Sequence, residues 1–179
     1  MKKEIVLGIT GSIAAYKACD IISALRKEGF SLTCVMTKEA HEFVTLLSVQ
    51  TLSQNEVHTD MFKPPAQWNP LHTSLAERAD LILIAPATAN VIGKLASGVC
   101  DDLLSSVVFS AKVPVLIVPA MNERMYAHRI IAENVKKLKA IGYKFVGPVK
   151  GHLACGHVGV GHIAPVEDIV RAVKKLLVS

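Results

Sequence analysis

Short, continuous apolar runs alternate along the chain with longer segments that have amphipathic helical spacing. Runs of this length, bounded by turn residues, are typical of strands buried on both faces of a sheet. Strands are predicted at Glu4–Gly8, Ser31–Met36, Leu81–Ala85, Val113–Val118 and Lys144–Val146. Helices are predicted at Ile13–Glu28, Glu42–Ser53, Thr73–Ala79, Glu123–Ala140 and Pro165–Leu177.

This alternation predicts an α/β fold, with a parallel sheet between two layers of helices. We expect the 179 residues to form a single domain over 1–179. Two segments lack a regular pattern and are predicted to be loops. Lys63–Pro70 is rich in proline, and Gly147–Pro165, with five glycines and three histidines, is expected to be a mobile flap.

Composition narrows the classes of function. The net charge of +5 comes from dispersed basic residues on helix faces, so we expect no nucleic-acid partner, although a small anionic substrate would be attracted. The sequence contains no run of 18 apolar residues, so no membrane-spanning helix is predicted. The four cysteines form no CxxC pair, which favours reduced thiols and a cytoplasmic location. The spacing of a cysteine and histidine cluster matches no standard zinc site, so no metal is expected; its members are His152, Cys155, His157 and His162.

The turn after the first strand has features of an anion site. Gly11 and Ser12 lead into a helix, whose first backbone N–H groups favour a phosphate, although Ser12 alone also suits a simple helix cap. An NAD site requires an acidic residue at the end of the second strand. That strand ends instead at Met36 and Thr37. The pattern therefore favours a flavin or another phosphorylated ligand.

Polar residues also follow the later strands. Thr88 and Asn90 lie in a turn of small residues, where a ligand can approach the backbone closely. Asn122 suits either a clamp on a carboxylate or the cap of the next helix. Asp101 and Asp102 indicate a helix N-terminus more simply than a catalytic pair of carboxylates.

Five segments in order, taken together, resemble one family over nearly the whole chain. They are TGSIAAYK at Thr10–Lys17, HTSLA at His72–Ala76, PATAN at Pro86–Asn90, PAMNERMY at Pro119–Tyr126 and LACG at Leu153–Gly156. This combination is similar to the flavin-containing cysteine decarboxylases, and most similar to the phosphopantothenoylcysteine decarboxylases of coenzyme A biosynthesis. The resemblance implies a flavodoxin-like fold, bound FMN and a homo-oligomer, either a trimer or a dodecamer, with the flavin at a subunit interface.

The resemblance also implies roles for individual residues. The catalytic residues of the family fall on His72, Asn122 and Cys155. Its FMN contacts fall on Gly11, Ser12, Thr37, Thr88, Asn90 and Met121, and its substrate contacts on Asn122, Ala154 and Gly156.

The implied reaction converts 4′-phosphopantothenoylcysteine to 4′-phosphopantetheine. FMN oxidises the thiol-bearing carbon to a thioaldehyde, which accepts the electrons that departing carbon dioxide leaves behind. His72 assists proton removal, Asn122 holds the substrate near its carboxylate, and Cys155 gives a proton when the remaining ene-thiol is reduced.

The chain departs from the family pattern mainly in the flap. Tyr126 replaces the usual Trp, His157 replaces an acid, and His162-Ile163 replaces Arg-Met. These changes concern the identity of the substrate more than flavin binding. Three alternatives stay open: a peptidyl-cysteine decarboxylase, whose members lack the flap cysteine; a flavin prenyltransferase, which shares the fold; and a non-catalytic flavoprotein subunit.

Overall fold

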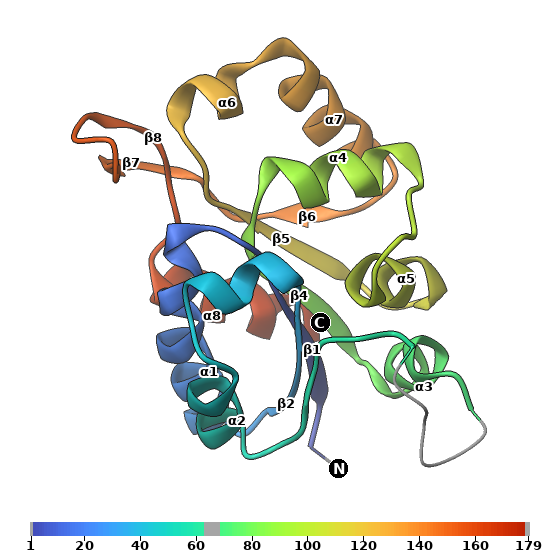
Figure 1. The fold of residues 1–179 in the computed structure, drawn as a ribbon. Helices are drawn as coiled ribbons and strands as arrows, with labels where there is room; N and C mark the ends of the chain where they lie inside the picture. Colours follow the sequence, from blue (N-terminus) through green and yellow to red (C-terminus); the bar gives the residue numbers. More distant parts are fainter. Residues whose placement is uncertain (1, 63–68, 178–179) are drawn as a thin grey trace.

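A computed structural model describes residues 2–62 and 69–177. A six-stranded parallel sheet forms its centre, with strand order β3-β2-β1-β4-β5-β6 (Figure 1). The strands are β1 (Glu4–Ile9), β2 (Ser31–Met36), β3 (Val57–His58), β4 (Leu81–Ala87), β5 (Val115–Pro119) and β6 (Lys144–Phe145). The predicted α/β fold with a parallel sheet is confirmed.

The strand order is that of a flavodoxin-like fold with one addition. When the two-residue edge strand β3 is set aside, the five remaining strands follow the order 2-1-3-4-5. The order reverses between β1 and β4, which pair directly. Ligands of such sheets bind beyond the carboxyl ends of the strands at this reversal. The turns after Ile9 and Ala87 therefore meet where a ligand is expected.

Helices cover both faces of the sheet (Figure 1). One face carries α1 (Lys17–Lys27), α2 (Leu46–Ser53) and α8 (Val166–Leu177); the other carries α3 (Leu71–Arg78), α4 (Ala89–Ser97), α5 (Leu103–Ser110) and α7 (Arg129–Ala140). Successive side chains of β1 divide between the two cores, with Leu7 in the first and Val6 in the second. A Cβ at Gly8 would collide with the side chain of Leu104, so glycine lets α5 pack directly on β1.

Three predicted helices are shorter than expected or broken. The predicted first helix begins as a 3₁₀ turn, η1 (Ile13–Tyr16). The predicted second, Glu42–Ser53, is shorter than expected, because a separate 3₁₀ turn, η2 (Lys38–Glu42), ends at Glu42 and α2 begins only at Leu46. The predicted long helix over Glu123–Ala140 divides into α6 (Glu123–Ala127) and α7. His128 separates them because its extended backbone ends α6, while its Nδ1 accepts a hydrogen bond from Ile130 N–H and caps α7.

The prediction that Gly147–Pro165 lacks regular structure is wrong, while its mobility as a flap stays a prediction. This segment contains an antiparallel hairpin of β7 (Val149–His152) and β8 (Val158–His162), which projects beside α6 (Figure 1). The tip is ordered by its own backbone, because Leu153 N–H donates to His157 O at 2.8 Å. The other predicted loop, Lys63–Pro70, lies outside the described residues over 63–68. Among the described helices, none has the length and apolar character needed to cross a bilayer.

Candidate functional site

Thr10 joins the two turns at the reversal of strand order. Its hydroxyl donates to Pro86 O at 2.7 Å and accepts from Thr88 N–H at 3.1 Å, and the residue is only 2% exposed. A buried hydroxyl with both hydrogen bonds satisfied fixes the positions of its partners. The turn after β1 is thereby held against the start of α4.

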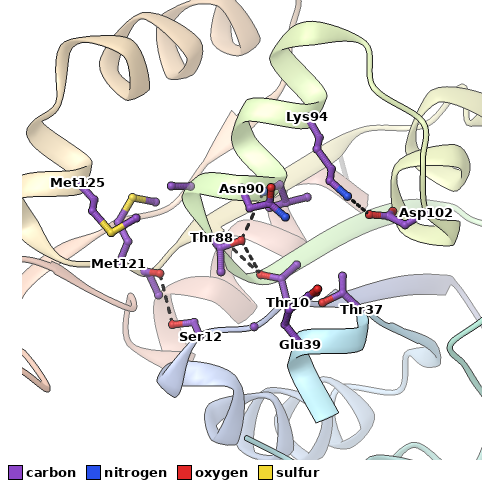
Figure 2. Close-up of a pocket in the computed structure, with 14 residues that line it drawn as sticks. Thr10, Ser12, Thr37, Glu39, Thr88, Asn90, Lys94, Asp102, Met121 and Met125 are labelled. Atoms are coloured by element: carbon purple, nitrogen blue, oxygen red, sulfur yellow. Dashed lines mark hydrogen bonds and ion pairs between the residues drawn. The ribbon is translucent and has the colours of Figure 1, made fainter. Parts of the chain in front are cut away.

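A cavity of about 270 Å³ opens beyond these turns (Figure 2). It collects residues that follow β1, β2, β4 and β5, as the strand order requires. All six residues assigned to FMN by resemblance line it: Gly11, Ser12, Thr37, Thr88, Asn90 and Met121. We call this the strand-end cavity. The structure brings these six residues together, and their roles in binding remain predictions.

The polar groups of the strand-end cavity are mostly neutral hydroxyls and helix N-termini. Thr88 accepts from Val91 N–H at 3.4 Å and caps α4, and Ser12 accepts from Ala14 N–H at 3.3 Å and caps η1. Thr37 Oγ1 is buried and has no hydrogen-bond partner among the described residues. Such a group is costly unless a ligand or water satisfies it. Gly11 allows the turn after β1 to pack closely against Glu39, because a Cβ at this position would collide with the Glu39 side chain.

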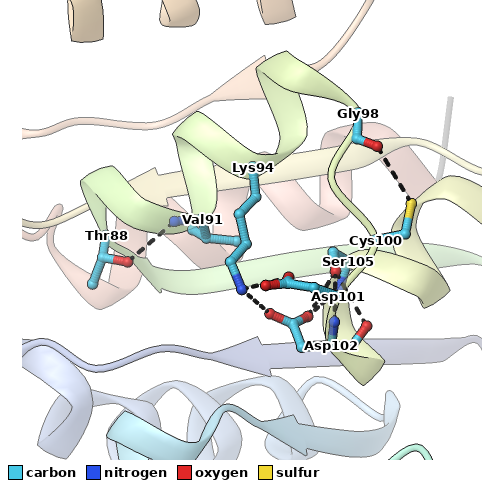
Figure 3. A network of polar contacts seen from close by, with 8 residues as sticks. All are labelled: Thr88, Val91, Lys94, Gly98, Cys100, Asp101, Asp102 and Ser105. Atoms are coloured by element: carbon cyan, nitrogen blue, oxygen red, sulfur yellow. Dashed lines mark hydrogen bonds and ion pairs between the residues drawn. The ribbon is translucent and has the colours of Figure 1, made fainter.

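One side of the strand-end cavity is charged (Figure 3). Lys94 Nζ lies 2.6 Å from Asp101 Oδ1 and 2.7 Å from Asp102 Oδ2. Partial burial acts to lower the pKa of Lys94, but the hydrogen bonds to the two carboxylates outweigh it and raise that pKa above its usual value. Asp102 also accepts from Ser105 N–H at 2.7 Å in a capping box. This arrangement favours the helix-capping interpretation of the two acids.

A second cavity, of about 380 Å³, lies under the hairpin. We call it the flap cavity. Two predicted catalytic residues meet on its wall, because Asn122 Nδ2 donates to Cys155 Sγ at 3.6 Å. Asn122 Oδ1 also accepts from Arg124 N–H at 2.9 Å and caps α6, so the capping interpretation is confirmed, while the clamp on a carboxylate stays a prediction. Ala154 lines the same cavity, whereas Gly156 is not among its lining residues.

The two cavities share a wall. Ser12, Ala120 and Met121 line both, and Ser12 Oγ donates to Ala120 O at 3.4 Å across that wall. A ligand in the strand-end cavity therefore lies next to the flap cavity. The thiol of Cys155 and the amide of Asn122 lie on the wall of this neighbouring cavity.

His72 is the predicted catalytic residue that the chain does not bring to these cavities. It lies in the first turn of α3, one residue inside the helix and not before it as predicted. It lines neither the strand-end cavity nor the flap cavity. Helix α3 packs against α5 and β1, at the opposite end of the molecule from the hairpin (Figure 1). Within the described residues, no group of three metal-ligating side chains is found.

Sequence reasoning missed several cavity residues. In the strand-end cavity these are Thr10, Glu39, Lys94 and Met125, and in the flap cavity Tyr16, His152, Leu153, His162 and Ile163. The positions of His152, Leu153, His162 and Ile163 depend on the hairpin, which the pattern did not predict. Thr10 alone carried a usable signal, since it directly follows a strand at the reversal of strand order.

The whole described fold matches a known family. The Flavoprotein family covers residues 1–178 of the chain. The chain belongs to the Flavoprotein family. The strand ends left a flavin or another phosphorylated ligand open, and membership supports the flavin, as the resemblance implied.

Two relatives of this flavoprotein are named for coenzyme A biosynthesis and for phosphopantothenoylcysteine decarboxylation. It is 44% identical to the coenzyme A biosynthesis bifunctional protein CoaBC of Bacillus subtilis, over 97% of this chain and 43% of that protein. It is 40% identical to a probable phosphopantothenoylcysteine decarboxylase of Streptococcus mutans, over 99% of this chain and 100% of that one. The chain thus spans less than half of the bifunctional relative.

Solved structures agree with the sequence relatives. A cysteine-to-serine variant of phosphopantothenoylcysteine decarboxylase, in complex with pantothenoylaminoethenethiol, matches this flavoprotein with a TM-score of 0.88 and 28% identity, over 100% of both chains. The predicted membership among flavin-containing cysteine decarboxylases and the flavodoxin-like fold are both confirmed.

The cavity residues fit FMN. The unpartnered hydroxyl of Thr37 and the N-termini of η1 and α4 offer donors to a phosphate or ribityl chain. The small residues Ala89 and Ala120 on the cavity wall leave room for it against the backbone. The flavin of this flavoprotein would therefore occupy the strand-end cavity and reach the shared wall.

Proposed function

We propose that this flavoprotein catalyses the FMN-dependent decarboxylation of 4′-phosphopantothenoylcysteine to 4′-phosphopantetheine. One observation carries the proposal: the Cys155 thiol and the Asn122 amide lie 3.6 Å apart over a cavity that shares its wall with the strand-end cavity. A flavin, a thiol and a carboxylate-binding amide are the groups that this chemistry requires. The relatives of this chain are named for the same reaction or pathway.

The strand-end residues would hold the cofactor. All six residues line the strand-end cavity, and Figure 2 shows Ser12, Thr37, Thr88, Asn90 and Met121 around it. When bound, FMN supplies reversible two-electron oxidation of the substrate carbon. Because Thr10 ties the two turns together, the cofactor site is largely formed before FMN arrives.

Asn122 and Cys155 would act on the substrate in the flap cavity. The Asn122 side chain is held at both ends, so its amide is oriented to donate to the substrate carboxylate. Cys155 is exposed on the flap and free of any disulfide, and it would deliver a proton to the unsaturated thiol left after carbon dioxide departs. Ala154 and Gly156 flank the thiol and would contact the substrate through their backbone.

We further propose that the site is completed in a homo-oligomer, a trimer or a dodecamer, with the flavin at the subunit interface. His72 would then assist proton removal in the site of a neighbouring copy. Two features support this arrangement. His72 lies away from the two cavities of its own chain, and Met125, which lines the strand-end cavity, leaves 49% of its surface exposed at the cavity rim. A cytoplasmic location fits this small-molecule role.

The decisive assay incubates the FMN-loaded protein with phosphopantothenoylcysteine under anaerobic conditions and measures carbon dioxide and product mass. We expect release of carbon dioxide and a saturated thiol. The matched variant is Cys155→Ser, which should release carbon dioxide only in proportion to the FMN present and leave the unsaturated thiol, because the two electrons stay on the flavin when no oxidant is present. This expectation parallels the pantothenoylaminoethenethiol bound to the cysteine-to-serine relative.

The alternatives give different outcomes in the same assay. A peptidyl-cysteine decarboxylase would act on a peptide with a C-terminal cysteine and leave the pantothenoyl substrate unchanged. A flavin prenyltransferase would modify its flavin when given a prenyl phosphate, and a non-catalytic subunit would bind FMN without turnover. Any of these results contradicts the proposal.

Mixing two inactive variants tests the shared site. If His72 acts in a neighbouring copy, His72→Asn and Asn122→Ala chains that are unfolded and refolded together should recover part of the activity, because some interfaces then hold both intact residues. Size-exclusion chromatography with light scattering gives the number of copies. No recovery from a mixed oligomer would place His72 and Asn122 in the same copy.

A further inference from the structure

Strand β8 of the hairpin has an inverted distribution of side chains. Its glycines, Gly159 and Gly161, are buried, whereas Val158 and Val160 are 53% and 44% exposed. A strand normally turns its apolar side chains toward the protein. Here the face without side chains is the one that points inward.

The buried face of β8 rests on the backbone that carries Asn122. A Cβ at Gly161 would lie much less than 3.0 Å from Met121 O and 3.2 Å from Glu123 N. A Cβ at Gly159 would collide with the Glu123 carboxylate. Gly161 O also accepts a hydrogen bond from Met121 N–H at 3.1 Å. Only glycine permits two backbones to approach this closely.

We propose that Gly161 and Gly159 are positioning residues, which seat the flap strand directly on Met121–Glu123 and so hold the Cys155 thiol against the Asn122 amide. The term "glycine seat" denotes Gly159, Gly161 and the Met121–Glu123 backbone. The inference rests on the proposed function only for its effect on turnover. The seat itself is a contact that can be measured without substrate.

The geometry explains why the seat matters for the thiol. Asn122 lies between Met121 and Glu123, the two residues that β8 contacts. Cys155 lies in the tip of the hairpin, between β7 and β8. Displacing β8 from Met121 moves the tip as a unit, because the hairpin is closed by its own ladder and by the Leu153–His157 hydrogen bond. Since hydrogen bonds weaken steeply with distance, a small shift separates Sγ from Nδ2.

The two glycines should differ in severity. At Gly161 the obstacle is the backbone of Met121, which cannot move without disturbing β5. At Gly159 the obstacle is the far end of the flexible Glu123 side chain. Gly161→Ala should therefore displace β8 from the Met121–Glu123 backbone, and Gly159→Ala should cause a smaller displacement. Removing the Glu123 side chain should rescue Gly159→Ala but not Gly161→Ala.

Amide hydrogen exchange measures the seat directly. In Gly161→Ala we expect the Met121 amide to exchange about tenfold faster or more, since its acceptor is displaced. The Ala120 amide is the internal reference, because it donates to Ala87 O inside the sheet at 3.0 Å. Val160→Thr is the matched control, an isosteric change on the exposed face of the same strand. The inference fails if the Met121 amide keeps its rate in Gly161→Ala, or if Ala120 accelerates equally.

Turnover gives the second readout. With FMN bound, and with dioxygen present to reoxidise flavin that stays reduced when the unsaturated thiol escapes, Gly161→Ala should raise the share of unsaturated thiol among the products severalfold while carbon dioxide is still released. Glu123→Ala should reverse the smaller effect of Gly159→Ala. A uniform loss of rate with an unchanged product ratio would contradict a role in placing Cys155. If the unaltered protein releases no carbon dioxide, the proposed function fails, while the exchange experiment still decides the seat.

Discussion

Asn122 performs two tasks with its two side-chain atoms, and a pair of substitutions can separate them. Oδ1 caps α6 and Nδ2 reaches Cys155. Asn122→Asp keeps the cap and replaces the amide donor with a charged oxygen. Asn122→Ala removes both. Stability and activity should therefore rank the two variants in opposite orders.

The structure sets the size of each effect. Asp and Asn cap a helix about equally well, whereas Ala in their place costs about 1 kcal/mol of folding free energy. For activity, losing a hydrogen bond to a charged group costs roughly 1.5–3 kcal/mol. The carboxylate of Asn122→Asp would also repel the substrate carboxylate, and two such charges about 4 Å apart repel by roughly 1 kcal/mol in water and about 4 kcal/mol at the effective dielectric near a protein surface. Asn122 is half-buried, which places the added repulsion between these limits.

Three measurements follow. Urea unfolding should show Asn122→Asp close to the unaltered protein and Asn122→Ala about 1 kcal/mol less stable. Steady-state decarboxylation should show kcat/KM falling roughly tenfold to a hundredfold in Asn122→Ala, and about tenfold or more further in Asn122→Asp. Flavin absorbance should be the same in all three, because Asn122 does not line the strand-end cavity. If Asn122→Asp is the more active of the two variants, the assignment of the amide to the substrate carboxylate is refuted.

Three other substitutions test the cavity wall and the fold. Thr37→Val should leave the FMN-free protein equally stable or more stable, because it removes an unpaired buried hydroxyl, while the Kd for FMN rises roughly fivefold in a fluorescence titration. Asp102→Ala should lower stability to urea by about 1–2 kcal/mol through loss of the α5 cap, and Asp102→Asn, which keeps the cap, by clearly less. The side chain of Lys3 holds the pKa of Asp80 below its usual value of 3.8. Ionised Asp80 therefore stabilises the fold above about pH 4 and this stabilisation is lost as the pH falls through the lowered pKa, so Asp80→Asn should flatten the acid limb of a stability–pH curve.

The sequence predicted the strands and the residues at their ends more fully than the helices. Buried parallel strands appear as continuous apolar runs, and their carboxyl ends must share one edge of the sheet. For this reason the segments after the strands were candidates for one site although they lie far apart in the chain, and the resemblance then implied FMN contacts at Ser12, Thr37, Thr88 and Met121. Helix breaks are harder to predict, because the extended backbone of the single residue His128 divides α6 from α7.

The hairpin was missed for a physical reason. Strand prediction relies on apolar side chains alternating toward the core, and β8 alternates valine with glycine. The inward residues Gly159 and Gly161 contribute no apolar side chain, so the segment has the composition of a loop. Their value lies in the absent Cβ, which becomes visible only when the Met121–Glu123 backbone is placed against them.

His72 shows where a motif and a fold give different information. The segment His72–Ala76 is intact and was assigned to the catalytic set by resemblance, yet α3 packs on α5, away from the hairpin that carries Cys155. A motif indicates which side chains a family's site contains, and a single chain shows only those that one copy can assemble. On the proposed function, the strand-end and flap cavities of one copy provide the cofactor pocket, the amide and the thiol. The remaining base must then come from a second copy, so the contact between copies becomes part of the catalytic site.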